Sequence, residues 1–119
     1  MAANKGWDSS TMPKGCGSRD FAPDQTIAQI GRMNILGISG GRVTTLRAKN
    51  RVVGIELPVG SGYKVRVFLD ADDTYVVQRV WREIVKASVE GVYCDMVGEV
   101  AYQAGMFQSN KDFGEAVIA

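Results

Sequence analysis

Few side chains in this sequence have the type and spacing that catalysis or metal binding requires. The chain contains no histidine, which excludes Ser-His-Asp triads, Cys–His dyads and most zinc sites. Asp70, Asp72 and Asp73 form an acidic run without the distal glutamate of an EF-hand, so the run predicts a hairpin turn. Asp95 and Glu99 are four residues apart, as in a solvated pair on a helix surface. We therefore expect no enzymatic activity, no metal site and no cofactor.

The two cysteines lie far apart in the chain and in different surroundings. Cys94 falls within an apolar helical pattern, where a thiol usually behaves as a small buried hydrophobe. Cys16 lies in the segment KGCGS, which predicts exposure. Nothing else in the sequence indicates an oxidising compartment, so we expect two free thiols.

Charge is unevenly distributed along the chain, although the net charge is +1. Residues 42–86 hold nine basic and five acidic side chains, whereas residues 87–119 hold one basic and five acidic ones. Cations and aromatic rings would intermingle on one face of a sheet formed by the basic segment. The candidate partner-binding residues on this face are Lys64, Arg66, Phe68, Tyr75, Arg79, Trp81 and Lys86.

Three interpretations of this basic and aromatic face remain open. Rings that stack on bases beside cations that meet phosphates are typical of single-stranded nucleic-acid binding. Arg, Trp and Tyr also anchor protein–protein interfaces, and a solvated sheet face with rings filling cross-strand gaps is the third interpretation. The sequence pI of about 7.7 argues against dedicated DNA binding, for which a value above about 9 is usual.

Length and composition predict one globular domain. The chain has 119 residues, of which 45% are hydrophobic, and no apolar run approaches the ~20 residues of a membrane-spanning helix. The N-terminal residues lack the apolar region of a secretory signal, so we expect a cytoplasmic protein without membrane contact. We expect residues 1–23 to form a flexible tail, residues 24–107 a single domain, and residues 108–119 a weakly structured end.

The first half of the domain predicts a helix followed by strands. Asp24 is a candidate N-cap and Gly31 a candidate C-terminal stop for a short helix. The segments NILGIS (34–39) and RVTTLR (42–47) predict two strands joined by a tight hairpin at Gly40-Gly41. A second turn at residues 48–50 precedes a third strand, RVVGIELP (51–58).

The second half predicts a hairpin, one more strand and a helix. YKVRVFL (63–69) and TYVVQRVW (74–81) alternate in hydropathy on either side of the acidic turn. If Leu69 faces Thr74, then Phe68 lies beside Tyr75 and Lys64 beside Arg79 on the outer side. REIVKASVE (82–90) predicts a further strand, and the apolar spacing over residues 94–104 predicts a helix that stops at Gly105. The pattern indicates an α+β fold, an antiparallel β-meander of four to six strands with the N-terminal and C-terminal helices packed on one face.

The order of several motifs resembles a known group of proteins. TIAQIG, GISGGRV and VEGVYCDMVGEVAYQAG, spread over residues 26–105, resemble motifs of small uncharacterised proteins of bacteriophages and other mobile elements. In this chain Arg32 follows Gly31, where the group has a second glycine. The resemblance implies an accessory protein that binds and blocks host machinery, including bacterial defence complexes, and it implies no functional residue.

We therefore predict a non-enzymatic binding protein of phage or mobile-element origin that inhibits a host factor in the bacterial cytoplasm. Its expected partner is a host protein or a ribonucleoprotein complex. One alternative is a nucleic-acid-binding module that uses the basic and aromatic face. Another is a self-associating structural protein, a homodimer held by strand edges or by the aromatic face.

Overall fold

One sheet, with its strands in chain order, organises the structure, a computed structural model that describes residues 2–4 and 6–107. Within these residues the strands are β1 (Ala2–Ala3), β2 (Thr44–Ala48), β3 (Arg51–Gly60), β4 (Tyr63–Leu69), β5 (Tyr75–Trp81) and β6 (Ile84–Val92). Strands β2 to β6 pair antiparallel with their neighbours, whereas β1 pairs parallel with β2.

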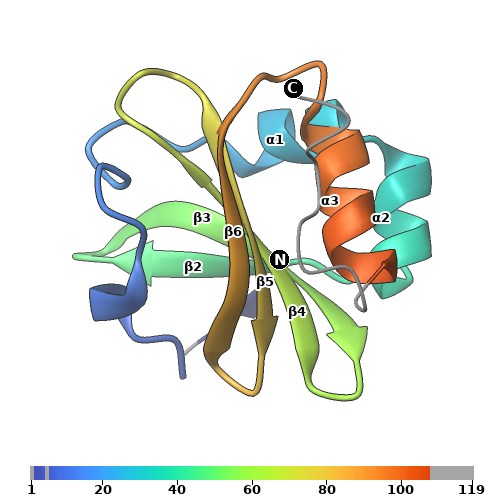
Figure 1. Ribbon diagram of the computed structural model, residues 1–119. Helices are drawn as coiled ribbons and strands as arrows, with labels where there is room; N and C mark the ends of the chain where they lie inside the picture. The colour runs from blue at the N-terminus through green and yellow to red at the C-terminus, as the bar shows by residue number, and fades with distance from the viewer. Residues whose placement is uncertain (1, 5, 108–119) are drawn as a thin grey trace.

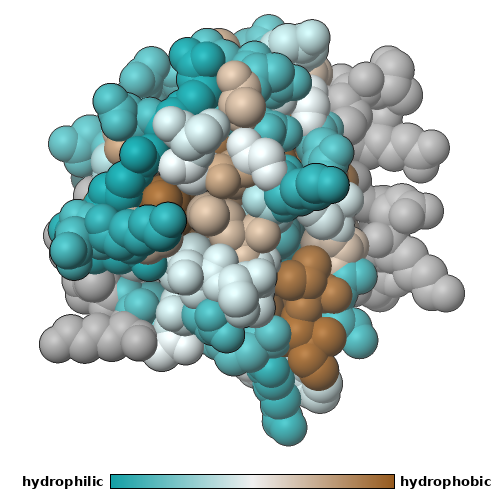
Figure 2. Space-filling model, turned by 90° about the vertical axis from the view of Figure 1, so that its left-hand side faces the viewer, coloured by the Kyte–Doolittle hydropathy of each residue, from teal (hydrophilic) through white to brown (hydrophobic). Residues whose placement is uncertain are grey.

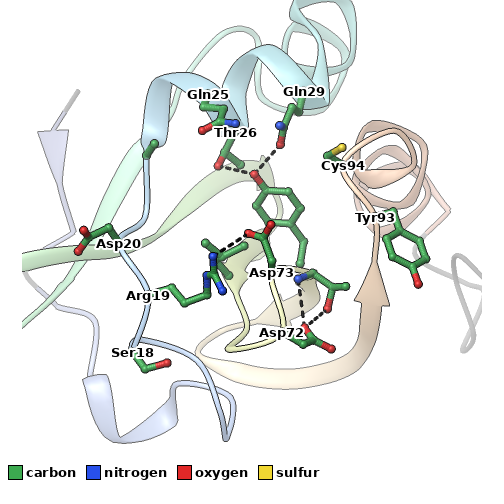
Figure 3. A pocket seen from close by; sticks show the side chains of 14 residues that line it. Ser18, Arg19, Asp20, Gln25, Thr26, Gln29, Asp72, Asp73, Tyr93 and Cys94 are labelled. Carbon is green, nitrogen blue, oxygen red and sulfur yellow. Dashed lines mark hydrogen bonds and ion pairs between the residues drawn. The ribbon is translucent and has the colours of Figure 1, made fainter.

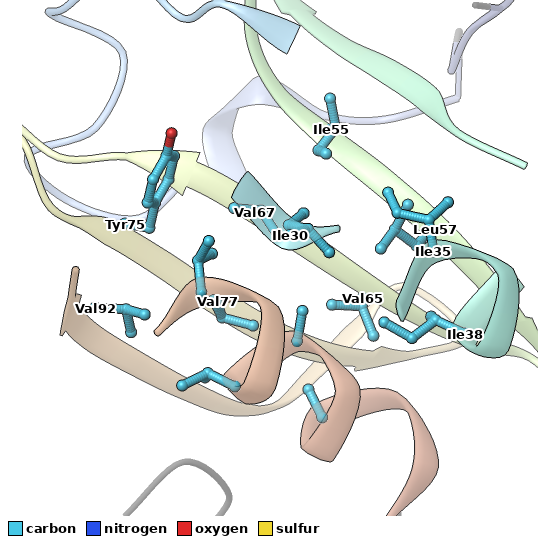
Figure 4. Close-up of a cluster of buried hydrophobic side chains, with 14 of the residues drawn as sticks. Ile30, Ile35, Ile38, Ile55, Leu57, Val65, Val67, Tyr75, Val77 and Val92 are labelled. Atoms are coloured by element: carbon cyan, nitrogen blue, oxygen red, sulfur yellow. The ribbon is translucent and has the colours of Figure 1, made fainter. Parts of the chain in front are cut away.

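Three α-helices of the described chain cover one face of the sheet (Figure 1). They are α1 (Pro23–Ile30), α2 (Arg32–Ser39) and α3 (Val97–Met106). The core on this side joins Ile30, Ile35 and Ile38 of the helices to inward-facing valines of β4 and β5 (Figure 4). The helix-covered antiparallel meander confirms the predicted α+β fold class.

A second, smaller core lies on the other face of the sheet. The N-terminal segment covers this face, on the side away from the helices (Figure 1). Trp7 is buried there with Phe68, Leu46 and Val76, and the centroids of the Trp7 and Phe68 rings are 5.9 Å apart. Gly54 makes room for the Phe68 ring, because a Cβ at this glycine would lie 2.8 Å from Phe68 Cδ1. Trp7, Met12 and Cys16 therefore pack against the sheet, in a segment that the sequence predicted as a flexible tail. The predicted weakly structured end, residues 108–119, lies outside the described residues.

The segment 34–39 forms part of helix α2 and not the predicted strand. Ile35 and Ile38 are three residues apart and both are buried, which matches one face of a helix better than the alternation of a strand. Gly40 does not close a hairpin: its left-handed backbone (φ 66°) ends the helix, and its N–H donates to the carbonyls of Ile35 and Leu36.

Two-residue turns with positive φ at both residues connect three of the strand pairs. They are Lys49-Asn50, Ser61-Gly62 and Arg82-Glu83. This geometry matches the right-handed twist of antiparallel strands. The Arg82-Glu83 turn lies inside the segment 82–90 that the sequence predicted as continuous strand, so β6 begins two residues later.

Both cysteines have the opposite environment to the predicted one. Cys94 is exposed, because it lies in the turn before α3 and not inside the helix. Cys16 is partly buried against the second core, and its backbone forms a β-bridge with Asp70. Burial, and next the negative charge of Asp70, raise the pKa of the Cys16 thiol to about 12.

We expect one fast-reacting thiol per native chain. With a pKa of about 12, only about one Cys16 side chain in ten thousand is a thiolate at pH 8, and the thiolate is the reactive form. Labelling with Ellman's reagent at pH 8 should release one equivalent rapidly, and the second only in denaturant. The variant Cys94→Ser should lose the fast phase. Two fast equivalents from the native protein would contradict this assignment.

Candidate functional site

The seven residues predicted to form one open face are divided between the two faces of the sheet. Strands β4 and β5 pair one residue away from the predicted register, with Leu69 opposite Tyr75 and Lys64 opposite Val80. Because side chains alternate along a strand, Lys64, Arg66 and Phe68 lie on the face toward the N-terminal segment. Tyr75 and Arg79 point to the helices, with Trp81 following in the same alternation.

Burial also removes most of the predicted face from contact with a partner. Arg66, Phe68, Tyr75 and Arg79 are each at most 6% exposed. Lys64 and Trp81 are partly exposed, and Lys86 is exposed. The prediction of an open basic and aromatic sheet face is therefore wrong, and the structure assigns these side chains to other tasks.

Arg66 is the centre of a buried ionic network. Its Nε donates to Glu56 Oε1 over 2.9 Å, and its terminal nitrogen Nη2 meets Glu83 Oε2 at 2.5 Å. Lys64 Nζ lies 2.7 Å from Glu83 Oε1, and Asn4 Nδ2 donates to the second oxygen of Glu56. The network joins β3, β4, the β5–β6 turn and the N-terminal segment.

Glu83 connects this network to a strained turn. Arg82 and Glu83 have φ values of 47° and 68°, a conformation that costs an L-residue about 1–2 kcal/mol. Partial burial acts to raise the pKa of Glu83, but hydrogen bonds from Lys64 and Arg66 outweigh it and hold the pKa below its usual value. The two cations thus stabilise the ionised carboxylate and offset part of the backbone strain.

Arg79 caps the C-terminus of helix α3. Its guanidinium donates to the carbonyl oxygens of Ala104, Gln103 and Phe107, at 2.7, 3.2 and 2.8 Å. A cation at this end also interacts favourably with the helix dipole. Burial lowers the pKa of Arg79, but the side chain remains charged because an arginine titrates far above neutral pH. The role of Arg79 is therefore structural.

Trp81 and Lys86 are two of the predicted residues that the structure brings together near the surface. Arg82 lies over the Trp81 ring with its central carbon 4.7 Å from the centroid, and Lys86 Nζ lies 5.9 Å from it. The indole Nε1 donates to the Ser61 carbonyl. Since cations already occupy the ring, this cluster offers less room for stacking a nucleobase than the predicted face did.

A polar cavity of about 830 Å³ opens between α1, the β4–β5 turn and residues 18–22 (Figure 3). The Tyr75 hydroxyl donates to Gln29 Oε1 over 2.5 Å and lies 3.1 Å from Thr26 Oγ1. Burial raises the pKa of Tyr75, and hydrogen bonds from Thr74 lower the pKa of Asp72. The Tyr75 hydroxyl thus joins β5 to α1, and Asp72 stabilises the β4–β5 turn through Thr74. The exposed thiol of Cys94 also lines the cavity.

An apolar groove of about 970 Å³ lies between α1, α2 and the strands β2 and β3. Its lining is mostly apolar and consists of Ile27, Ala28, Arg32, Ile35, Leu36, Gly41, Arg42, Val43, Thr44 and Pro58. Leu36 is 46% exposed, and on the same helix Met33 is 79% exposed. The sequence did not reveal this groove because α2, which forms one of its walls, was predicted as a strand.

Other exposed apolar side chains lie at the start of β6, where Ile84 is 56% and Val85 39% exposed. The face drawn in Figure 2 has its largest strongly hydrophobic patch toward the lower right, with paler hydrophobic colour across the middle and teal around it. A hollowed apolar surface is typical of a binding site, because a ligand or partner segment that enters it is surrounded by apolar contacts. The groove is therefore the stronger candidate site.

Among residues 2–4 and 6–107, no group of three or more Cys, Asp or Glu side chains is placed to hold a metal ion. In the same part of the chain, no helix is long and apolar enough to cross a membrane. No protein-family model matches the sequence, and neither the curated proteins nor the solved structures contain a match. The site is therefore assigned from its geometry.

Proposed function

We propose that this chain is a small binding protein whose protein partner docks in the groove between α1, α2 and β3. The observation that supports this proposal is an open apolar hollow of about 970 Å³ in the described surface. Apolar surface of this kind is favourable to bury, at about 25 cal/mol per Å² removed from water. The chain would act by occupying a surface of its partner.

Two exposed side chains of α2 suit this function. Leu36 borders the groove, and Met33 extends the apolar surface one turn toward the start of the helix. Methionine is flexible and polarisable, and it adapts well to partner surfaces. A groove built from two helices and a strand end is also the kind of surface that accepts an apolar segment of another protein.

We further propose that the partner is a host factor and that binding inhibits it. The resemblance of the TIAQIG, GISGGRV and VEGVYCDMVGEVAYQAG motifs to phage and mobile-element proteins supports this part of the proposal. A bacterial defence complex is one such target. The groove replaces the basic and aromatic face as the proposed contact surface.

Capture of the partner by matched variants tests the proposal. The immobilised full chain is incubated with a bacterial lysate, and the bound proteins are identified by mass spectrometry. We expect Leu36→Glu, which places a charge at the groove, to lose the specific partner at least about tenfold. Ile84→Glu, the same kind of change at an exposed apolar residue of β6 outside the groove lining, should retain most of it.

Crosslinking separates contact at the groove from indirect effects. A photoreactive phenylalanine analogue at position 36 should crosslink to the captured partner, whereas the same analogue at the exposed Ser88 of β6 should not. Circular dichroism and thermal unfolding should show that all variants are folded. Equal capture by the wild type and Leu36→Glu, or crosslinking from position 88 alone, would contradict the proposal.

A further inference from the structure

The charged residues in the lining of the groove are both arginines, Arg32 and Arg42. No acidic side chain contributes to the lining within residues 2–4 and 6–107. In that part of the chain Arg32 forms no hydrogen bond or ion pair, and the Arg42 side chain forms one hydrogen bond, from Nε to the Ser39 carbonyl. The apolar floor is therefore flanked by cations with capacity for a further partner.

The two arginines lie at opposite ends of helix α2. Arg32 is its first residue, and Arg42 follows three residues after its last residue, Ser39. A helix of eight residues is about 12 Å long, and the Arg42 N–H donates to the Ser39 carbonyl at its end, so the backbones of the two arginines lie roughly 12 Å apart. A partner segment that satisfies both cations needs two carboxylates about 12 Å apart, with apolar side chains between them.

The neighbouring sheet makes a helix the better occupant than a strand. An extended peptide would gain affinity by adding to a sheet edge, but beside the groove β2 is already paired. Thr44 pairs with Ala2 on one side and with Glu56 on the other. The backbone of Thr44, the strand residue of β2 that lines the groove, is therefore not free to pair with an added strand, whereas a helix satisfies its own backbone groups and presents only side chains.

We infer that the groove binds an acidic amphipathic helix of the partner protein. This inference rests on the proposed function and specifies the chemistry of the partner. The helix carries apolar residues at positions i+3 and i+4 and carboxylates at i and i+7 or i+8, since seven to eight residues of helix span about 10–12 Å. The apolar residues enter the floor beside Ile35 and Leu36, and the carboxylates reach Arg32 and Arg42.

Two synthetic peptides test the charge requirement. Both are 16-residue helical peptides with the same apolar stripe, one with glutamate and one with lysine at the two flanking positions. Fluorescence anisotropy with the full chain in 50 mM NaCl should show the glutamate peptide binding at least about tenfold more tightly. The preference should decrease at 300 mM NaCl, because salt screens exposed ion pairs.

Charge-reversal variants place the preference in the groove. The double variant Arg32→Glu/Arg42→Glu should bind the lysine peptide better than the glutamate peptide. Arg47→Glu/Lys49→Glu is the matched control, because it changes the net charge equally at exposed residues of the β2–β3 hairpin outside the groove lining. This control should retain the wild-type preference for glutamate.

The outcomes distinguish this inference from the proposed function. Three results would overturn the inference that the groove binds an acidic helix. They are equal binding of the two peptides, binding of neither peptide, and an unchanged preference for glutamate in Arg32→Glu/Arg42→Glu. If partner capture then still depended on Leu36, the proposed function would stand and only the inference about the acidic helix would be lost. The apolar dye ANS tests for a small apolar ligand. If ANS bound, Leu36→Glu blocked its binding, and neither peptide bound, the groove would accept a small apolar ligand and the inference would be overturned.

Discussion

Replacing Arg66 with methionine should lower the free energy of unfolding by about 3–5 kcal/mol, the usual cost of removing one partner of a buried ion pair. Glu56 is 4% exposed and would lose its buried charged partner to an apolar side chain. Asn4 and Thr44 would still donate to Glu56 Oε2, but Lys64 Nζ, 3.9 Å from Oε1, is too distant to replace the guanidinium. The free energy of unfolding of a native domain is about 5–15 kcal/mol, so the expected loss is a large fraction of it.

Urea unfolding at pH 7, monitored by circular dichroism, measures this effect. Lys64→Met is the matched control: it removes a cation of the same network whose main partner, Glu83, is half exposed, and we expect a cost of at most about 1 kcal/mol. The double variant Arg66→Met/Glu56→Gln should regain part of the lost stability, because it removes the unpaired charge. If Arg66→Met cost no more than Lys64→Met, Arg66 would not be the stabilising centre of the network.

Local patterns in the sequence were sufficient to predict much of the fold. The alternation of Tyr63, Val65, Val67 and Leu69 identified β4, and the glycine at position 31 correctly marked the end of α1. Cross-strand register was not available from the same patterns. The predicted turn spans residues 70–73, but Asp70 N–H donates to the Thr74 carbonyl, and Asp73, with φ 69°, closes a three-residue turn.

This single-residue difference explains why the predicted site failed. A shift of one residue moves side chains that were expected to share a face onto opposite faces. The burial of Arg66 depends on Glu56 and Glu83, which come from a neighbouring strand and from a turn without glycine or asparagine. The groove depends on how α1 and α2 meet β3, and such contacts between distant segments leave no local signal in the sequence.

Replacing Gly98 with alanine should destabilise the protein by at least about 2 kcal/mol, because the added methyl group overpacks a closed helix contact. A Cβ at this position would collide with the carbonyl oxygen of Ile30, at the end of α1, and lie 2.8 Å from Asn34 Nδ2. That carbonyl oxygen already accepts a hydrogen bond from Asn34 Nδ2. Backbone cannot yield as a flexible side chain does, so α3 must move away from α1 and expose the apolar core between them.

Gly37→Ala provides the matched control, since it makes the same change inside a helix. Its Cβ would lie 3.3 Å from Cε1 of the partly exposed Tyr102, a ring that can shift, and alanine gains up to about 1 kcal/mol in helix propensity over glycine. We therefore expect Gly37→Ala to be neutral or slightly stabilising, and Gly98→Ala to lose stability despite the same propensity gain. Chemical denaturation of both variants measures the difference. If the two variants had the same free energy of unfolding, α3 would not pack closely on the end of α1. This contact would then not fix the positions of Ile27 and Ala28 in the groove wall.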